Sequence, residues 1–159
     1  MTATDRPGFE LPLRLLLGFR TLVDELNAQL AREGHPEVRP VHGFALQAIG
    51  PAGSTAVELG RRLGVSKQAA GKTIDALERM GYVQRRDDPA DGRRKVVALT
   101  PRGSDCLVRS ARIFDELRGR WADVLGETRL RALEDDLRRV TPGLSLGVDA
   151  PGWFGAAGD

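Results

Sequence analysis

The chain has 159 residues, a net charge of +2, and 41% hydrophobic and 29% charged residues. This is the composition of an ordinary folded domain, long enough to bury a core or to form one subunit of an intertwined dimer. No apolar run reaches the ~20 residues that span a bilayer, and the N-terminus lacks a signal-peptide pattern, so we expect a cytoplasmic protein with no membrane partner. The single cysteine, Cys106, excludes an intramolecular disulfide framework.

The first fifty residues predict one long and one short amphipathic helix. Apolar residues recur at helical spacing over residues 11–30, and this helix is expected to end near Gly34. A loop over residues 35–40 leads to a short helix over residues 41–49. The glycine- and proline-containing segment 50–53 then breaks the chain again, and Ser54 or Thr55 is expected to cap the helix that follows.

A helix-turn-helix is predicted on either side of Gly64. This glycine can adopt positive φ in a sharp turn, and Ser66 is a good N-cap for a second helix that runs to Met80 and stops at Gly81. Helical spacing turns one face of that helix toward the core and the other outward. The core face carries Ala70, Ile74 and Leu77, and the outward face carries Lys67, Gln68, Gly71, Lys72 and Asp75.

The outward residues suit the major groove of DNA. Gln68 can pair with adenine through two hydrogen bonds, while Lys67 and Lys72 suit guanine or phosphate. An interior glycine such as Gly71 costs a helix about 1 kcal/mol relative to alanine. Either a neighbouring helix or DNA therefore approaches the backbone there, and we expect a neighbouring helix.

Two strands follow, over residues 82–86 and 95–99, joined by a polar loop with turn signals at Asp88-Pro89 and Asp91-Gly92. Alone, such a loop would be a solvated turn. Directly after a helix-turn-helix, a hairpin with Arg93 and Arg94 at its tip is interpreted as a wing.

The segment from Glu58 to Gly103 is basic. It contains eleven Lys and Arg against six Asp and Glu, a net charge of +5, so the rest of the chain carries −3. A polyanion would meet this segment first.

The C-terminal part predicts two more helices. Thr100-Pro101 is a helix start, and the first helix is expected to carry Leu107, Phe114, Leu117, Trp121 and Leu125 on one face. After Gly126, a second helix covers residues 127–140. The terminal helices have more apolar surface than a small winged domain can cover, so they are expected to pack against those of a second copy. The tail after Pro142 is expected to be flexible, unless Trp153-Phe154 docks on a hydrophobic groove.

Three segments closely resemble the MarR family of winged helix-turn-helix regulators. They are Val65-Ser66-Lys67-Gln68 through Val83, Asp88 through Arg93, and Leu99 through Gly103. The resemblance is specific over residues 55–103 and looser over residues 11–140. The small Ala69-Ala70-Gly71 run departs from the family pattern, in which bulkier or hydroxylic residues are common.

The resemblance implies a mainly α fold with a small β wing (α+β) and N- and C-terminal dimerisation helices. It implies that the helix over residues 66–80 enters the major groove, and that Asp91 holds Arg93 toward the minor groove. The expected divisions are a dimerisation helix over residues 1–38, a DNA-binding domain over 39–103, dimerisation helices over 104–141 and a tail over 142–159.

We therefore predict a sequence-specific regulator of transcription, acting as a repressor and a homodimer on an inverted repeat in double-stranded DNA. The DNA-binding residues are predicted to be Ser66, Lys67, Gln68, Gly71, Lys72, Asp91, Arg93 and Arg94. The alternative is a winged helix that binds proteins, which would need an apolar or acidic face in place of these cations. No convergent catalytic groups, metal-ligand cluster or phosphate loop is present in the sequence, so no enzyme activity, metal or cofactor is expected.

Two further residue assignments leave alternatives open. The resemblance implies that the short helix with His42 and Gln47 borders a cleft, where a small aromatic ligand could bind and relieve repression, although a hydrogen-bonded structural histidine is the favoured interpretation. Cys106 could be a redox sensor, since Arg102 and Arg109 would favour its thiolate, but a small buried residue is the favoured interpretation.

Overall fold

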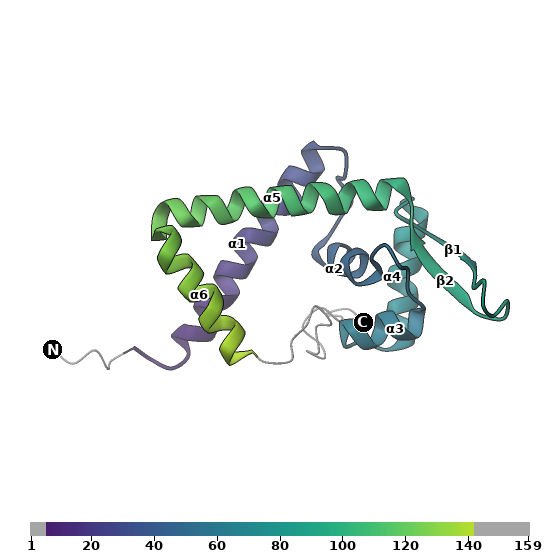
Figure 1. Ribbon diagram of the computed structural model, residues 1–159, viewed down its shortest axis with the longest axis horizontal. Helices are drawn as coiled ribbons and strands as arrows, with labels where there is room; N and C mark the ends of the chain where they lie inside the picture. Colours follow the sequence, from purple (N-terminus) through teal and green to yellow (C-terminus); the bar gives the residue numbers. More distant parts are fainter. Residues whose placement is uncertain (1–5, 142–159) are drawn as a thin grey trace.

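The computed structural model describes residues 6–141 as six helices and one two-stranded antiparallel sheet (Figure 1). In chain order these are α1 (Glu10–Arg32), α2 (Pro40–Ile49), α3 (Ala56–Leu63), α4 (Lys67–Arg79), β1 (Val83–Asp87), β2 (Lys95–Leu99), α5 (Pro101–Leu125) and α6 (Glu127–Val140). The predicted fold class is confirmed. The Trp153-Phe154 pair and the tail over residues 142–159 lie outside the described residues.

The elements form two parts that share one helix (Figure 1). Helices α2, α3 and α4 and the β hairpin gather at one end, which we call the winged lobe. Helices α1 and α6 and the second half of α5 form the other end, the helical base. Helix α5 runs between them, packing against α2 and β2 near its start and against α1 and α6 further along.

The hydrophobic core fills the winged lobe and extends to the second half of α1. Its most enclosed members include Leu30, Leu46, Leu59, Ile74, Leu77 and Tyr82. The first half of α1 contributes little to it, since Leu15 and Leu17 are each 46% exposed. None of the helices in the described residues is long and apolar enough to span a membrane.

Helix α5 faces the core with a different line of residues from the predicted one. Cys106 and Ile113 are buried together with Leu117, whereas Phe114 is 40% exposed. The predicted stripe followed the largest apolar side chains. Because the lobe packs against the first half of α5, the smaller Cys106 and the β-branched Ile113 face inward instead.

A polar joint links the end of α1 to the base of the wing and to α5. The buried His35 lies 2.9 Å through Nδ1 from the Tyr82 hydroxyl and 2.9 Å through Nε2 from the Asp105 carboxylate. Arg102 donates to the Tyr82 hydroxyl and stacks over its ring, 4.7 Å from the centroid. Arg109 donates to Asp105 and holds the pKa of that carboxyl below its ordinary value. These bonds fix the winged lobe against the helical base.

Candidate nucleic-acid interface

The helix-turn-helix is built by local hydrogen bonds that the sequence predicts. Thr55 and Glu58 form a capping box: the Glu58 amide donates to Thr55 Oγ1, and the Thr55 amide donates to Glu58 Oε2. Gly64 takes φ 66° in the turn, and Ser66 accepts the Ala69 amide at 3.0 Å to cap α4. The start of α4 is thereby held beside α3.

Helix α4 presents a polar outer face. Ala70, Ile74 and Leu77 are buried, as predicted. The opposite side exposes Lys67, Gln68, Lys72, Asp75 and Arg79. Among the described residues, Lys67, Lys72 and Arg79 make no ion pair, so their charges remain available to a ligand.

The structure corrects the expectation for Gly71. A Cβ added there would meet nothing within 4 Å outside its own helix backbone, so no neighbouring helix explains this glycine. The contrast is Gly60 of α3, where a Cβ would lie 2.9 Å from the Val65 carbonyl oxygen. A neighbouring helix of the same protomer is therefore excluded as the reason for this glycine, and close approach of DNA stays a prediction.

The wing is an ordered hairpin. Strand β1 pairs with β2 from Val83 opposite Leu99 to Asp87 opposite Lys95. At the tip, Asp91 accepts the backbone amide of Arg93 at 3.1 Å, so the carboxylate shapes the loop and leaves the exposed guanidinium of Arg93 without an ion pair among the described residues. The orientation of Arg93 toward a minor groove stays a prediction.

Arg94 is engaged within the protein. Its guanidinium donates to Glu58 at 2.9 Å, which joins the wing to the start of α3. The Thr55 amide, and secondarily the charge of Arg94, lower the pKa of Glu58 below its ordinary value. Glu58 is therefore ionised at neutral pH and offsets the charge of Arg94.

A cationic hollow separates the wing from the helix-turn-helix. Its volume is about 590 Å³, and its wall combines the starts of α3 and α4 with β2. Five cations line it against the single carboxylate of Glu58: Arg61, Lys67, Arg93, Arg94 and Lys95. A phosphodiester backbone fits this charge, because each phosphate contact replaces a condensed counterion.

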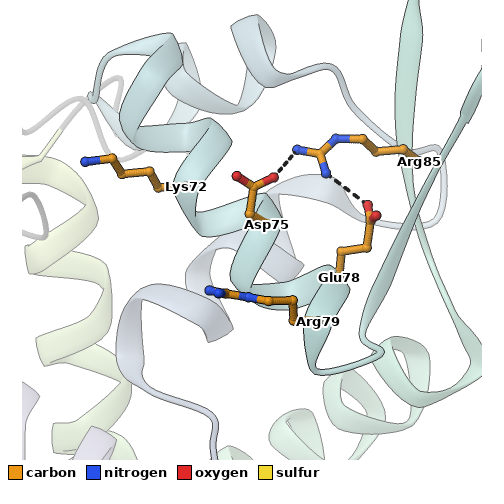
Figure 2. A pocket seen from close by; sticks show the side chains of 5 residues that line it. All are labelled: Lys72, Asp75, Glu78, Arg79 and Arg85. Carbon is orange, nitrogen blue, oxygen red and sulfur yellow. Dashed lines mark hydrogen bonds and ion pairs between the residues drawn. The ribbon is translucent and has the colours of Figure 1, made fainter.

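One feature of the interface was missed by sequence reasoning. Arg85 of β1 reaches back to α4 and bridges Asp75, at 2.6 Å, and Glu78, at 3.0 Å (Figure 2). The hydrogen bond to Asp75 is the main reason that the pKa of Arg85 is raised. The alternation of residues along a strand does not predict this bridge. The bridge joins β1 to α4, and the angle between these two elements is defined only in the folded protein.

His42 and Gln47 lie on α2, which precedes the helix-turn-helix in the chain. His42 is half-buried, and its Nδ1 accepts the Arg39 amide at 3.2 Å, which supports the interpretation as a structural histidine. Burial lowers the pKa of its imidazole. Gln47 is exposed.

Cys106 is 1% exposed, and burial raises the pKa of its thiol. A redox sensor needs an accessible thiolate, so the prediction of a small buried residue is confirmed and the redox alternative loses its basis.

Comparisons with known proteins agree with this architecture. Residues 38–94 match the model of the MarR family. An uncharacterised protein of Mycobacterium tuberculosis is 28% identical over 110 residues, which cover 69% of this chain and 75% of the relative.

Two solved structures share the fold over most of the chain. Streptococcus pneumoniae FabT, solved in complex with DNA, matches with a TM-score of 0.72 at 18% identity, covering 84% of this chain and 94% of FabT. Wild-type apo MarR from E. coli matches with a TM-score of 0.66 at 24% identity, covering 86% of this chain and 98% of MarR. Residues 38–94 are therefore similar to the MarR family of regulators, and the fold is shared with FabT and MarR over more than four fifths of the chain.

Proposed function

We propose that the protein is a homodimeric repressor that binds an inverted repeat in duplex DNA, with α4 in the major groove and the wing beside it. The observation that carries the proposal is the set of cations on the outer face of α4 and around the cationic hollow. Arg94 and Lys95 are paired with Glu58 and Asp87, whereas the others make no ion pair among the described residues: Arg61, Lys67, Lys72, Arg79 and Arg93. Residues 39–103 would bind DNA, and residues 1–38 and 104–141 would form the dimer. As a regulator of chromosomal genes, the protein would act in the cytoplasm.

The alternative of a protein-binding winged helix is less well supported. Such a module needs an apolar or acidic docking face. The exposed face of α4 is polar, and Val57 of α3, 49% exposed, is the one large exposed hydrophobic residue on α2, α3, α4 and the hairpin. The family that residues 38–94 match consists of regulators, so no enzyme activity is proposed.

Sequence preference is proposed to come from Gln68. A bidentate pair to a base is worth ~1–3 kcal/mol of discrimination. Gln68→Ala is therefore expected to relax the preference at one position of each half-site and to leave non-specific binding nearly intact. Selection of bound fragments from random duplexes, followed by sequencing, measures this.

Gln84→Ala is the matched control, because Gln84 is also an exposed glutamine of the winged lobe but lies on β1. Its selected sequences should equal those of the wild type. If Gln68→Ala selected the same sequences as the wild type, Gln68 would not contact a base.

The wing arginines are proposed to give affinity with little base information. Each phosphate contact contributes about 0.9 to the slope of log K against log salt concentration. Arg93→Ala should reduce that slope by about this amount. Arg94→Ala should reduce it less, since Arg94 already has Glu58 as its partner, but should weaken binding by leaving the Glu58 carboxylate unpaired near the DNA. Unchanged affinity and slope for Arg93→Ala would show that the wing lies off the DNA.

Relief of repression by a small aromatic ligand near His42 and Gln47 is the last part of the proposal. A ligand that favours a different spacing of the two winged lobes would lower DNA affinity, and by linkage operator DNA would weaken the ligand by the same factor. Titration of candidate aromatic acids against the free protein and the DNA complex measures both. Equal affinities in the two titrations would contradict the switch.

A further inference from the structure

The outer face of α4 mixes charges of both signs. Along the helix lie Lys72, Asp75, Glu78 and Arg79, and with Arg85 they line one pocket. Figure 2 shows the guanidinium of Arg85 between the two carboxylates, while the side chains of Lys72 and Arg79 point away from it. Three cations thus share this surface with two anions, and both anions are turned toward the same cation.

The pairing of Asp75 with Arg85 is one of several ion pairs that the geometry of α4 allows. Asp75 lies three residues after Lys72 and four before Arg79. Opposite charges at these spacings attract one another on a helix surface. Without Arg85, Asp75 could therefore pair with either cation of its own helix. The planar guanidinium of Arg85 can hold two carboxylates at once, whereas pairing along α4 would join Asp75 to one cation only. The bonds of Arg85 to Asp75, at 2.6 Å, and to Glu78, at 3.0 Å, have this two-point arrangement.

We propose that Arg85 is a positioning residue for DNA binding: it holds Asp75 and Glu78 toward β1, so that Lys72 and Arg79 remain free for phosphates of duplex DNA. This inference rests on the proposed function, since it concerns how the same face of α4 meets DNA. Arg85 itself is 36% exposed in its side chain and is occupied by two carboxylates, so it acts through the cations that it leaves unpaired.

A double-mutant cycle tests the idea in the full-length protein. The four proteins are the wild type, Arg85→Gln, Asp75→Asn with Glu78→Gln, and the triple variant. The probe is a short duplex of random sequence, and fluorescence anisotropy measures its affinity across a series of salt concentrations. In the wild-type background, Arg85→Gln should release Asp75 onto Lys72 or Arg79 and reduce the salt slope by about 0.9, the value for one phosphate contact.

In the background without the two carboxylates, Arg85→Gln should leave the slope unchanged, because no anion remains to divert. An equal reduction of about 0.9 in both backgrounds would instead mean that Arg85 contacts a phosphate directly, and would overturn the inference. No reduction in either background would overturn it as well. Failure of the wild-type protein to bind the duplex would be a different result, because it would overturn the proposed function itself.

Arg85→Lys keeps the charge and guards against a folding defect in the neutral variant. A lysine is a point charge and holds one carboxylate well rather than two. The salt slope of Arg85→Lys should therefore lie between those of the wild type and Arg85→Gln. A slope equal to that of the wild type would show that charge alone is sufficient, and would contradict a role for the two-point bridge.

Discussion

Leu133→Asp is expected to abolish dimerisation and to weaken operator binding by about two to four orders of magnitude. Leu133 of α6 is 39% exposed in the protomer, so the carboxylate of an aspartate there can reach water and the protomer should still fold. In the proposed dimer the same side chain would be covered, together with the exposed leucines of α1. A monomer engages one half-site, and it loses the ~10²–10⁴ gain that linkage of two binding modules provides.

Sedimentation measures the mass, and titration with the full inverted repeat measures the affinity. Ala132→Asp is the control, because it places the same acid on the side of α6 that carries Asp135, Asp136 and Arg139. It should stay dimeric. A folded monomer of Leu133→Asp that held the inverted repeat with wild-type affinity would refute the dimer proposal.

Gly103→Ala is expected to cost about 3 kcal/mol of the free energy of unfolding, at the upper end for an overpacked site. A Cβ at residue 103 would lie 2.2 Å from the backbone carbonyl oxygen of Tyr82. That oxygen cannot move away easily, because it accepts the Thr100 amide at 3.0 Å. The start of α5 would therefore be pushed off the base of the wing.

Gly119→Ala gives the comparison within the same helix. A Cβ there meets nothing within 4 Å in the protomer, so the higher helix propensity of alanine should add about 1 kcal/mol. Urea denaturation at one fixed protein concentration compares the two, since the stability of a dimer depends on concentration. Equal effects of the two substitutions would show that α5 does not rest on the Tyr82 carbonyl.

The helices and the wing could be predicted because their signals are local. Thr55 and Ser66 cap the helices within three residues, and Gly64 turns the chain between them, so no distant contact is needed to define the helix-turn-helix. The packing of α5 was predicted less well. Which of Ile113 and Phe114 faces the core depends on the position of the lobe, and the helical period of the sequence alone permits both.

In the candidate site, too, the local features could be predicted from the sequence and the long-range contacts could not. The exposed cations of α4 and the wing tip followed from spacing and turn chemistry. The ion pairs that decide which of these cations are free could not be predicted in this way. Arg94 pairs with Glu58 across 36 residues, and Arg85 pairs with Asp75 across ten. For Gly71, the sequence showed that an interior glycine needs a reason, but only the structure excludes a neighbouring helix as that reason.

The shared helix α5 has a consequence for how the protein can be divided. Domains joined by a linker can be cut apart or exchanged, but here Cys106 and Ile113 of α5 belong to the core of the winged lobe. A fragment that ended at Gly103 would leave the apolar partners of both residues facing water. An independently folding lobe, or a chimera that carries this lobe on the helical base of a relative, must therefore include α5 at least as far as Ile113.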